Sequence, residues 1–184
     1  MNPFKIHNLE SAPKGSKPIL EKSLKETGMI ANLHGVMAES PALLEGYQKI
    51  HALAQETSFS DEEVTVVWQT FNVEHACHYC VPAHTVIANM MKVDPAITGA
   101  LRSRSKLPTE KLQVLHETAL LMGRNRGVLA DEDVEKFYAA GYENRQLLEI
   151  VLILSQKIMS NYVNHLADTP LDAPFQPFVW EKVS

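Results

Sequence analysis

Cysteine is scarce in this chain, which has only two among its 184 residues, Cys77 and Cys80. Secreted disulfide scaffolds use more cysteines and spread them along the chain, so the count argues against that class. In a reducing compartment, an isolated CxxC pair is more often catalytic or metal-binding. The two cysteines therefore become the first candidates for chemistry.

Long apolar runs are also lacking. The longest block, residues 147–154, is interrupted by Glu149 and falls well short of the roughly 18 to 20 apolar residues that span a bilayer. Residues 1–18 lack the apolar stretch of a secretory signal. We therefore expect a cytoplasmic protein with no membrane partner.

Basic clusters and nucleotide-binding motifs are missing as well. The net charge is −5, and the richest basic stretch, residues 102–106, is typical of a solvated helix end. A mildly acidic surface is a poor match for nucleic acid, which we do not expect as a partner. Neither GxGxxG nor GxxxxGKS occurs, so no nucleotide, flavin or nicotinamide cofactor is expected.

The chain does contain repeated signals for the start of a helix. Ser40 and Asp94 each precede a proline, which is the order expected of a capping residue and the first helical position. Ser60 and Glu63 fit a capping box, and Asp131 can cap the segment that follows it. Apolar residues recur at spacings of three and four, whereas alternating strand patterns are scarce. The sequence predicts an all-α fold.

The two ends of the chain differ from its middle. Residues 1–17 are predicted to form an extended N-terminal arm, and residues 18–184 a single helical domain that includes the tail. Residues 143–167 are predicted to form a long central helix, because residues 147–154 within them are apolar nearly all round. Prolines in the tail argue against helix there, and its aromatic residues should dock on this domain or a neighbouring subunit: Phe175, Phe178 and Trp180.

The segment around the cysteines is the most informative. Pro82 is tolerated only in the first turn of a helix, so the helix should begin between residues 78 and 81. Cys77 and Cys80 then lie at a helix N-terminus, where unpaired amides and the helix dipole favour a thiolate. His84 shares a helix face with Cys80 and could take up its proton or deliver one to a leaving oxygen. The second cysteine could then close a disulfide.

Plainer interpretations of the same residues remain. The cysteines could bind zinc with His75, His78 or His84, although a second ligand pair at recognisable spacing is missing and the only distant histidine beside a polar cluster is His165. They could instead be small core residues, since free cysteine is often buried. His84 could be a hydrogen-bonded core histidine. These alternatives stay open at the level of sequence.

The pattern Glu74-x-x-Cys77-x-x-Cys80-x-x-x-His84 resembles the signature of the alkylhydroperoxidase D-like proteins within the carboxymuconolactone decarboxylase family. Upstream and downstream stretches are similar too, so that the resemblance covers roughly residues 28–180. It implies an all-α fold that assembles as a homo-oligomer, often a trimer or hexamer. It also implies that the CxxC pair lies on a helix in a buried cleft.

The resemblance further implies a role for each matching residue. Cys80 would attack the peroxide, and Cys77 would form a disulfide with it and then exchange with an external thiol or lipoyl-type reductant. His84 would belong to the proton relay. The chain departs from the family pattern at two positions: Tyr79 stands where the family has a histidine, and Thr65 stands where it has a glutamate.

Two glutamates are candidates for the missing carboxylate of that relay. Glu63 already has a structural explanation in the capping box, so Glu74 is the predicted relay residue. Three polar residues farther along the long helix either face the same cleft or bond to the tail or a subunit interface: Asn161, Asn164 and His165.

These residues predict a thiol-dependent peroxidase or disulfide oxidoreductase that reduces small hydroperoxides in antioxidant defence. No bound cofactor or metal is expected, only an external dithiol reductant. Lactone decarboxylation, which gives the wider family its name, is an alternative that does not need a dithiol. A non-enzymatic oligomeric redox sensor is another. Replacing Cys77 and Cys80 by serine would separate thiol chemistry from decarboxylation.

Overall fold

The computed structural model describes residues 4–182, and every regular element in that range is helical. The predicted all-α fold is confirmed. None of the helices in this range is long and apolar enough to cross a bilayer. The described chain forms α1 (Lys17–Thr27), α2 (Asn32–Met37), α3 (Pro41–Gln55), α4 (Asp61–Glu74), α5 (Cys80–Met90), α6 (Pro95–Ser103), α7 (Glu110–Arg124), α8 (Asp131–Ala139), α9 (Asn144–Ala167) and the 3-10 helix η1 (Ala173–Phe178).

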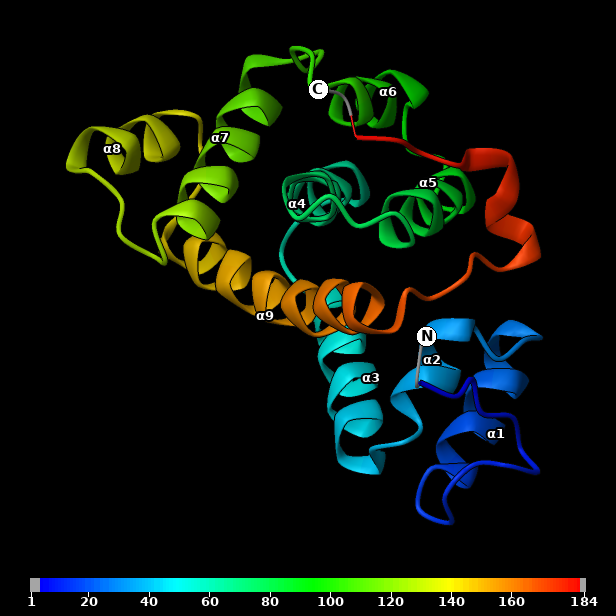
Figure 1. Cartoon of the computed structure of the whole chain (residues 1–184). Helices are drawn as coiled ribbons and strands as arrows, with labels where there is room; N and C mark the ends of the chain where they lie inside the picture. Colours follow the sequence, from blue (N-terminus) through cyan, green and yellow to red (C-terminus); the bar gives the residue numbers. More distant parts are fainter. Residues whose placement is uncertain (1–3, 183–184) are drawn as a thin grey trace.

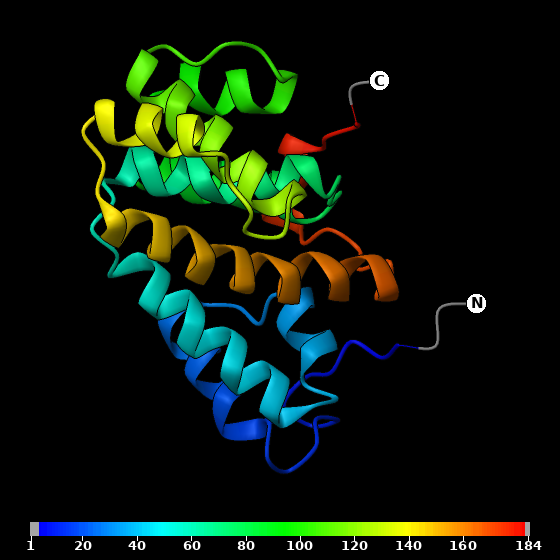
Figure 2. The same ribbon diagram turned by 90° about the vertical axis from the view of Figure 1, so that its left-hand side faces the viewer.

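Helix α9 crosses the middle of the molecule, with α1 to α3 on one side and α4 to α8 on the other (Figures 1 and 2). Its central place confirms the prediction of a long central helix. Helix α4 is buried from Val64 to Val73 and contacts α5, α6, α7 and α9. Residues 4–182 nevertheless leave one face of α9 uncovered, and five large side chains are exposed along it: Leu148, Val151, Ile158, Tyr162 and Leu166.

The helix starts follow the local signals in the sequence. Ser40 and Asp94 accept backbone N–H bonds at the starts of α3 and α6. Ser60 and Glu63 form both bonds of the predicted capping box on α4. The prediction for Asp131 is wrong by one position, because this residue is the first of α8 and its side chain does not cap the helix.

The described part of the N-terminal arm folds across α2. The His7 backbone N–H donates to the Gly35 carbonyl oxygen at 3.0 Å, and the Ser16 hydroxyl donates to the Ala38 carbonyl oxygen at 2.6 Å. A Cβ atom at Gly35 would lie 2.7 Å from the Ile6 side chain, so only glycine permits this close approach. Residues 1–3 of the predicted arm and residues 183–184 of the tail lie outside the described range.

The tail docks on its own domain, as one of the two predicted possibilities. The Trp180 indole N–H donates to the Arg102 carbonyl at 2.9 Å, and the Phe175 ring meets the Tyr79 ring edge-on at 5.7 Å between centroids. The tail is not free of helix, however, because η1 forms there. Pro174 lies in the first turn of η1, where a missing N–H costs nothing, and Pro177 lies inside this short 3-10 helix. The prolines therefore exclude an α-helix in the tail but not a short 3-10 helix.

Candidate active site

A tight turn between α4 and α5 directs the first cysteine into the core. Ala76 adopts a left-handed conformation with φ of 53°, and the Cys77 N–H then donates to the Asn72 carbonyl at 2.9 Å. This conformation costs an alanine about 1 kcal/mol, which the surrounding contacts must offset. Helix α5 begins at Cys80 with Pro82 in its first turn. The predicted helix start is confirmed.

Both cysteines are free thiols, and both are buried, with exposed fractions of 0% for Cys77 and 2% for Cys80. The Cys80 backbone N–H donates to the Cys77 sulfur at 3.2 Å. This amide belongs to the first turn of α5 and has no partner within the helix, as expected at a helix N-terminus. The structure therefore places the dithiol where the sequence predicted it.

Helix α9 contributes amide donors from the opposite side. The Asn164 Nδ2 donates to the Cys80 sulfur at 3.2 Å, while its Oδ1 is buried without a partner in the protein. The Asn161 Nδ2 donates to Asn72 Oδ1 at 3.0 Å, and its own Oδ1 accepts a bond from His75 at 2.8 Å. Asn161 and Asn164 thus face the dithiol side, whereas His165 is exposed.

A lysine that the sequence analysis did not consider completes the site. Lys157 of α9 is completely buried, and its Nζ lies 2.8 Å from the His84 Nε2. An ammonium donates and an imidazole nitrogen accepts, so the hydrogen of neutral His84 belongs on Nδ1. That Nδ1 is buried and has no partner in the protein. Among the described residues, no carboxylate forms an ion pair with Lys157.

The surroundings of the two thiols shift their pKa values in opposite directions. Burial alone would raise the pKa of Cys80, but the Cys77 hydrogen bond, the Lys157 charge and the amides of Asn161 and Asn164 outweigh it and lower the pKa to about 5. Burial and the neighbouring Cys80 raise the pKa of Cys77 well above its ordinary value. At neutral pH, Cys80 is therefore the thiolate and Cys77 the thiol.

The two nitrogen bases respond to the same surroundings. Burial, then the Lys157 charge, then His51 lower the pKa of His84 well below its ordinary value, so this imidazole is neutral. Burial also lowers the pKa of Lys157, whereas the negative charge of the dithiol, carried by Cys80 at neutral pH, raises it. The ammonium form of Lys157 thus depends on an ionised thiol close by.

Aromatic rings and a glutamine connect His84 to helices on both sides of α9. The Trp68 ring lies 5.0 Å from the His84 ring and 5.8 Å from the His51 ring, between centroids. The Gln156 side chain accepts from the Trp68 indole and donates to His51 Nδ1, both at 2.9 Å. These contacts fix the orientation of His84 from α3, α4 and α9 together.

The structure does not bring Glu74 to the dithiol, so its prediction as the relay carboxylate is wrong. The Glu74 carboxylate is held by Arg124 of α7 through two bonds of 2.7 and 2.8 Å. Glu63, the other candidate, pairs with Lys111 at 2.9 Å. Neither the sequence distance to the cysteines nor the helix pattern reveals these partners, because both belong to α7.

Tyr79, one of the two departures from the pattern that the sequence resembles, holds the tail. Its hydroxyl donates to the Asp172 carboxylate, and Asp172 also accepts the Asn32 backbone N–H at 3.1 Å. The adjacent His78 donates from Nε2 to the Thr169 carbonyl at 2.9 Å. The CxxC segment is thus bonded directly to the chain that covers it.

The histidines considered as zinc ligands have other partners. His75 bonds to Asn161 and His78 to Thr169, while His84 bonds to Lys157. No group of three or more His, Cys, Asp or Glu side chains in residues 4–182 is arranged to hold a metal ion. A structural zinc site of the usual four-ligand type has no donor set here.

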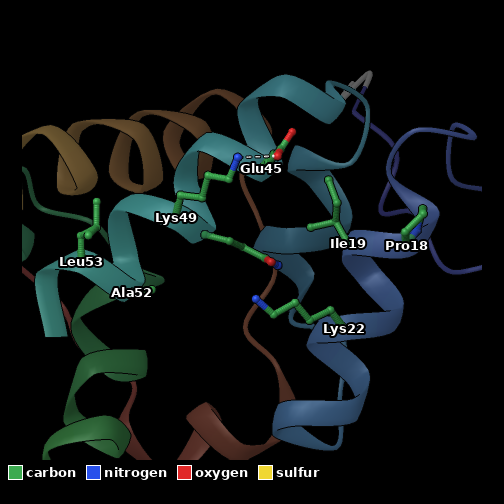
Figure 3. A pocket seen from close by; sticks show the side chains of 8 residues that line it. Pro18, Ile19, Lys22, Glu45, Lys49, Ala52 and Leu53 are labelled. Carbon is green, nitrogen blue, oxygen red and sulfur yellow. Dashed lines mark hydrogen bonds and ion pairs between the residues drawn. The ribbon is translucent and has the colours of Figure 1, made fainter. Parts of the chain in front are cut away.

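Hollows on the surface lie away from the thiols. A groove of about 490 Å³ runs between α1 and α3, where Glu45 and Lys49 pair at 2.6 Å (Figure 3). A second hollow, of about 220 Å³, lies beside Glu74 and Arg124. Neither is lined by Cys77 or Cys80. The two thiols themselves are almost completely buried, and neither of these two hollows opens onto them.

Lys157 could have been found from helix spacing. It lies four positions before Asn161 and seven before Asn164, and these spacings place all three on one face of a helix. A lysine on the same face as two buried amides calls for a partner, because lysine is almost never fully buried unless paired. The helix face that carries Asn161 and Asn164 therefore extends back to Lys157.

No family model matches this sequence, and no curated protein matches it. Solved structures do. One is an alkylhydroperoxidase AhpD core, an uncharacterized peroxidase-related protein from Ralstonia eutropha JMP134. It gives a TM-score of 0.82 at 15% identity, over 95% of this chain and 96% of the other. An uncharacterized peroxidase-related protein from Silicibacter sp. TM1040 gives a TM-score of 0.77 at 18% identity over 94% of each chain.

A third solved structure belongs to a protein of named activity. A variant of the debrominase Bmp8 in complex with 2,3,4-tribromopyrrole gives a TM-score of 0.74 at 15% identity, over 96% of this chain and 95% of the other. At these identities the likenesses establish the fold and nothing finer. The chain has the all-α alkylhydroperoxidase D-like fold, as the sequence resemblance implied.

Proposed function

We propose that this protein is a thiol-dependent peroxidase that reduces small hydroperoxides through Cys80 and Cys77. The observation that carries the proposal is that the two thiols at one helix start differ in pKa. Cys80 is held as a thiolate by hydrogen bonds and the Lys157 charge, and Cys77 remains a thiol one CxxC spacing away. A peroxidase of this kind needs both an ionised nucleophile and a protonated partner.

The first step is attack by the Cys80 thiolate on the terminal oxygen of the hydroperoxide. A sulfur–oxygen bond forms and the O–O bond breaks, which gives a sulfenic acid on Cys80 and an alkoxide that leaves as an alcohol after taking up one proton. Two electrons pass from sulfur to the peroxide. Because the developing charge is on oxygen in a buried site, a nearby proton donor lowers the barrier.

Asn164 is suited to position the hydroperoxide for this attack. Its Nδ2 bond to Cys80 fixes the orientation of the amide, since the oxygen end would be repelled by a thiolate. The Oδ1 next to it has no partner in the protein and can accept the hydrogen of the terminal peroxide oxygen. The reacting oxygen would then be held beside the sulfur.

The second step closes the disulfide. The Cys77 sulfur attacks the sulfenic sulfur of Cys80, the S–O bond breaks, and the hydroxide leaves with the Cys77 proton as water. An external dithiol then reduces the disulfide by exchange and returns two electrons and two protons. The buried position of both sulfurs favours a reductant that acts when the covering tail opens.

The test measures peroxide consumption over many turnovers with dihydrolipoamide or dithiothreitol as reductant. We expect turnover in the native protein, none in Cys80→Ser, and none in Cys77→Ser. The two variants differ in a second readout: Cys77→Ser should still form one sulfenic acid per chain, trapped by a dimedone-type reagent, and Cys80→Ser should form none. Turnover by Cys80→Ser would refute the proposal.

Two other activities are decided by the same protein samples. A single oxidation per chain without turnover would favour a redox sensor. Activity toward a lactone substrate that survives both serine variants would favour decarboxylation. Tribromopyrrole, the ligand of the debrominase structure, tests whether the same thiolate acts on a carbon–bromine bond instead of an oxygen–oxygen bond.

A further inference from the structure

Lys157 is a buried cation, and within residues 4–182 the dithiol alone balances its charge. The titratable groups that face it are His84 and Cys80 from α5, Cys77 just before α5, and His51 from α3. Both histidines are neutral bases, and no carboxylate of the described residues pairs with the ammonium. A buried charge without a partner is costly, so the Cys80 thiolate is the counter-ion that keeps Lys157 protonated.

Oxidation removes that counter-ion. In the reduced protein the ammonium and the thiolate balance each other. A disulfide carries no charge, so the same ammonium would stand alone among neutral groups in a site without water-exposed surface. Under these conditions a lysine neutralises by losing its proton. The proton thus becomes available in the same reaction that consumes the thiolate.

We propose that Lys157 is the acid that supplies the proton of the leaving alcohol, and that it stays neutral until the disulfide is reduced. This inference rests on the proposed peroxidase function. The route runs through His84, which accepts from Lys157 at Nε2 over 2.8 Å and carries its own hydrogen on the unpartnered Nδ1. His84 gives up the Nδ1 hydrogen to the leaving oxygen as it receives the lysine proton at Nε2.

The protons and electrons balance without help from solvent. The alcohol takes one proton, which originates on Lys157, and the water formed with the disulfide takes the Cys77 proton. An external dithiol later supplies two electrons and two protons, one to Cys77 and one to Lys157. In this scheme the oxidising half of the cycle takes up no proton from the medium. A thiolate brings no proton of its own, so without Lys157 the leaving alkoxide would have to take one from solvent.

The decisive measurement is the proton count of that half reaction. The reduced protein, in weak buffer at neutral pH with an indicator dye, receives one equivalent of hydrogen peroxide per chain. We expect no net proton uptake, together with one thiolate per chain in the ultraviolet absorbance before oxidation. Uptake of one proton per chain would mean that Lys157 keeps its proton, and would overturn the inference.

A lysine-to-arginine variant provides a contrast. Lys157→Arg retains a positive charge that does not dissociate near neutral pH, so its oxidation should take up one proton per chain and its peroxide step should slow about a hundredfold. Lys157→Met should lose the thiolate absorbance at neutral pH. Lys136→Met, which removes an exposed lysine of α8, should behave as the native protein in every readout. If neither Lys157 variant folds, the native proton count decides.

Oxidation by diamide separates this inference from the proposed function. Diamide also takes two electrons and two protons when it oxidises a dithiol, so the same proton count applies without peroxide. No proton uptake with diamide in a protein that does not turn over peroxide would refute the peroxidase while leaving Lys157 as the redox-linked proton carrier. Peroxide turnover with uptake of one proton per chain would support the peroxidase and refute the role of Lys157 as proton carrier.

Discussion

Asn164 offers a direct test of how the thiolate is stabilised. Its Nδ2 lies 3.2 Å from the Cys80 sulfur, and the longer contact of 3.9 Å to Cys77 contributes little. A hydrogen bond to a charged group is worth roughly 1.5 to 3 kcal/mol. Because one pKa unit corresponds to about 1.36 kcal/mol, Asn164→Ala should raise the pKa of Cys80 by roughly one to two units. From about 5, the pKa would move to between about 6 and 7.

The assay is a pH titration of the thiolate absorbance in the reduced protein, which reads the buried sulfur without requiring a reagent to reach it. Asn89→Ala is the matched control, because Asn89 lies on α5 but is exposed. Its titration should coincide with that of the native protein. A Cys80 midpoint that stays within a few tenths of a unit in Asn164→Ala would refute the role assigned to the amide. The Lys157 charge would then be the main stabiliser.

Three further predictions concern stability and the tail. Burial lowers the pKa of His34 and of His51 from 6.5 to about 4, so the unfolded chain binds more protons as the pH falls below 6.5. The free energy of unfolding, from urea titrations, should therefore fall by roughly 3 kcal/mol per histidine between pH 6.5 and 4, and a total loss under about 2 kcal/mol would contradict this. Glu74→Gln breaks a partly exposed ion pair and should lower the free energy of unfolding by at most about 1 kcal/mol. Peroxide turnover should be unchanged. A tenfold slower turnover would show that Glu74 takes part in the proton relay. Tyr79→Phe removes a buried donor to Asp172 and should lower the free energy of unfolding by roughly 1 to 3 kcal/mol. Alkylation of Cys80 should become faster, because the tail opens more often. An unchanged alkylation rate would show that the tail does not control access to the thiols.

The fold could be predicted largely from local sequence. A capping residue acts within three or four positions, which is why the local sequence correctly predicts the caps at Ser40, Ser60 and Asp94. The same short range explains why Pro82 marked the beginning of α5. The 3-10 helix in the tail does not follow from the proline content, because proline excludes an α-helix but not a short 3-10 turn.

By itself, the sequence determined the helices and the position of two cysteines at the start of one of them. The tertiary structure alone decided which charged groups meet. Glu74 pairs with Arg124, fifty positions later, and Lys157 reaches His84 across 73 positions. The physical reason is that helix formation depends on neighbours within a turn, whereas the ionisation of a buried group depends on whatever long-range packing places beside it.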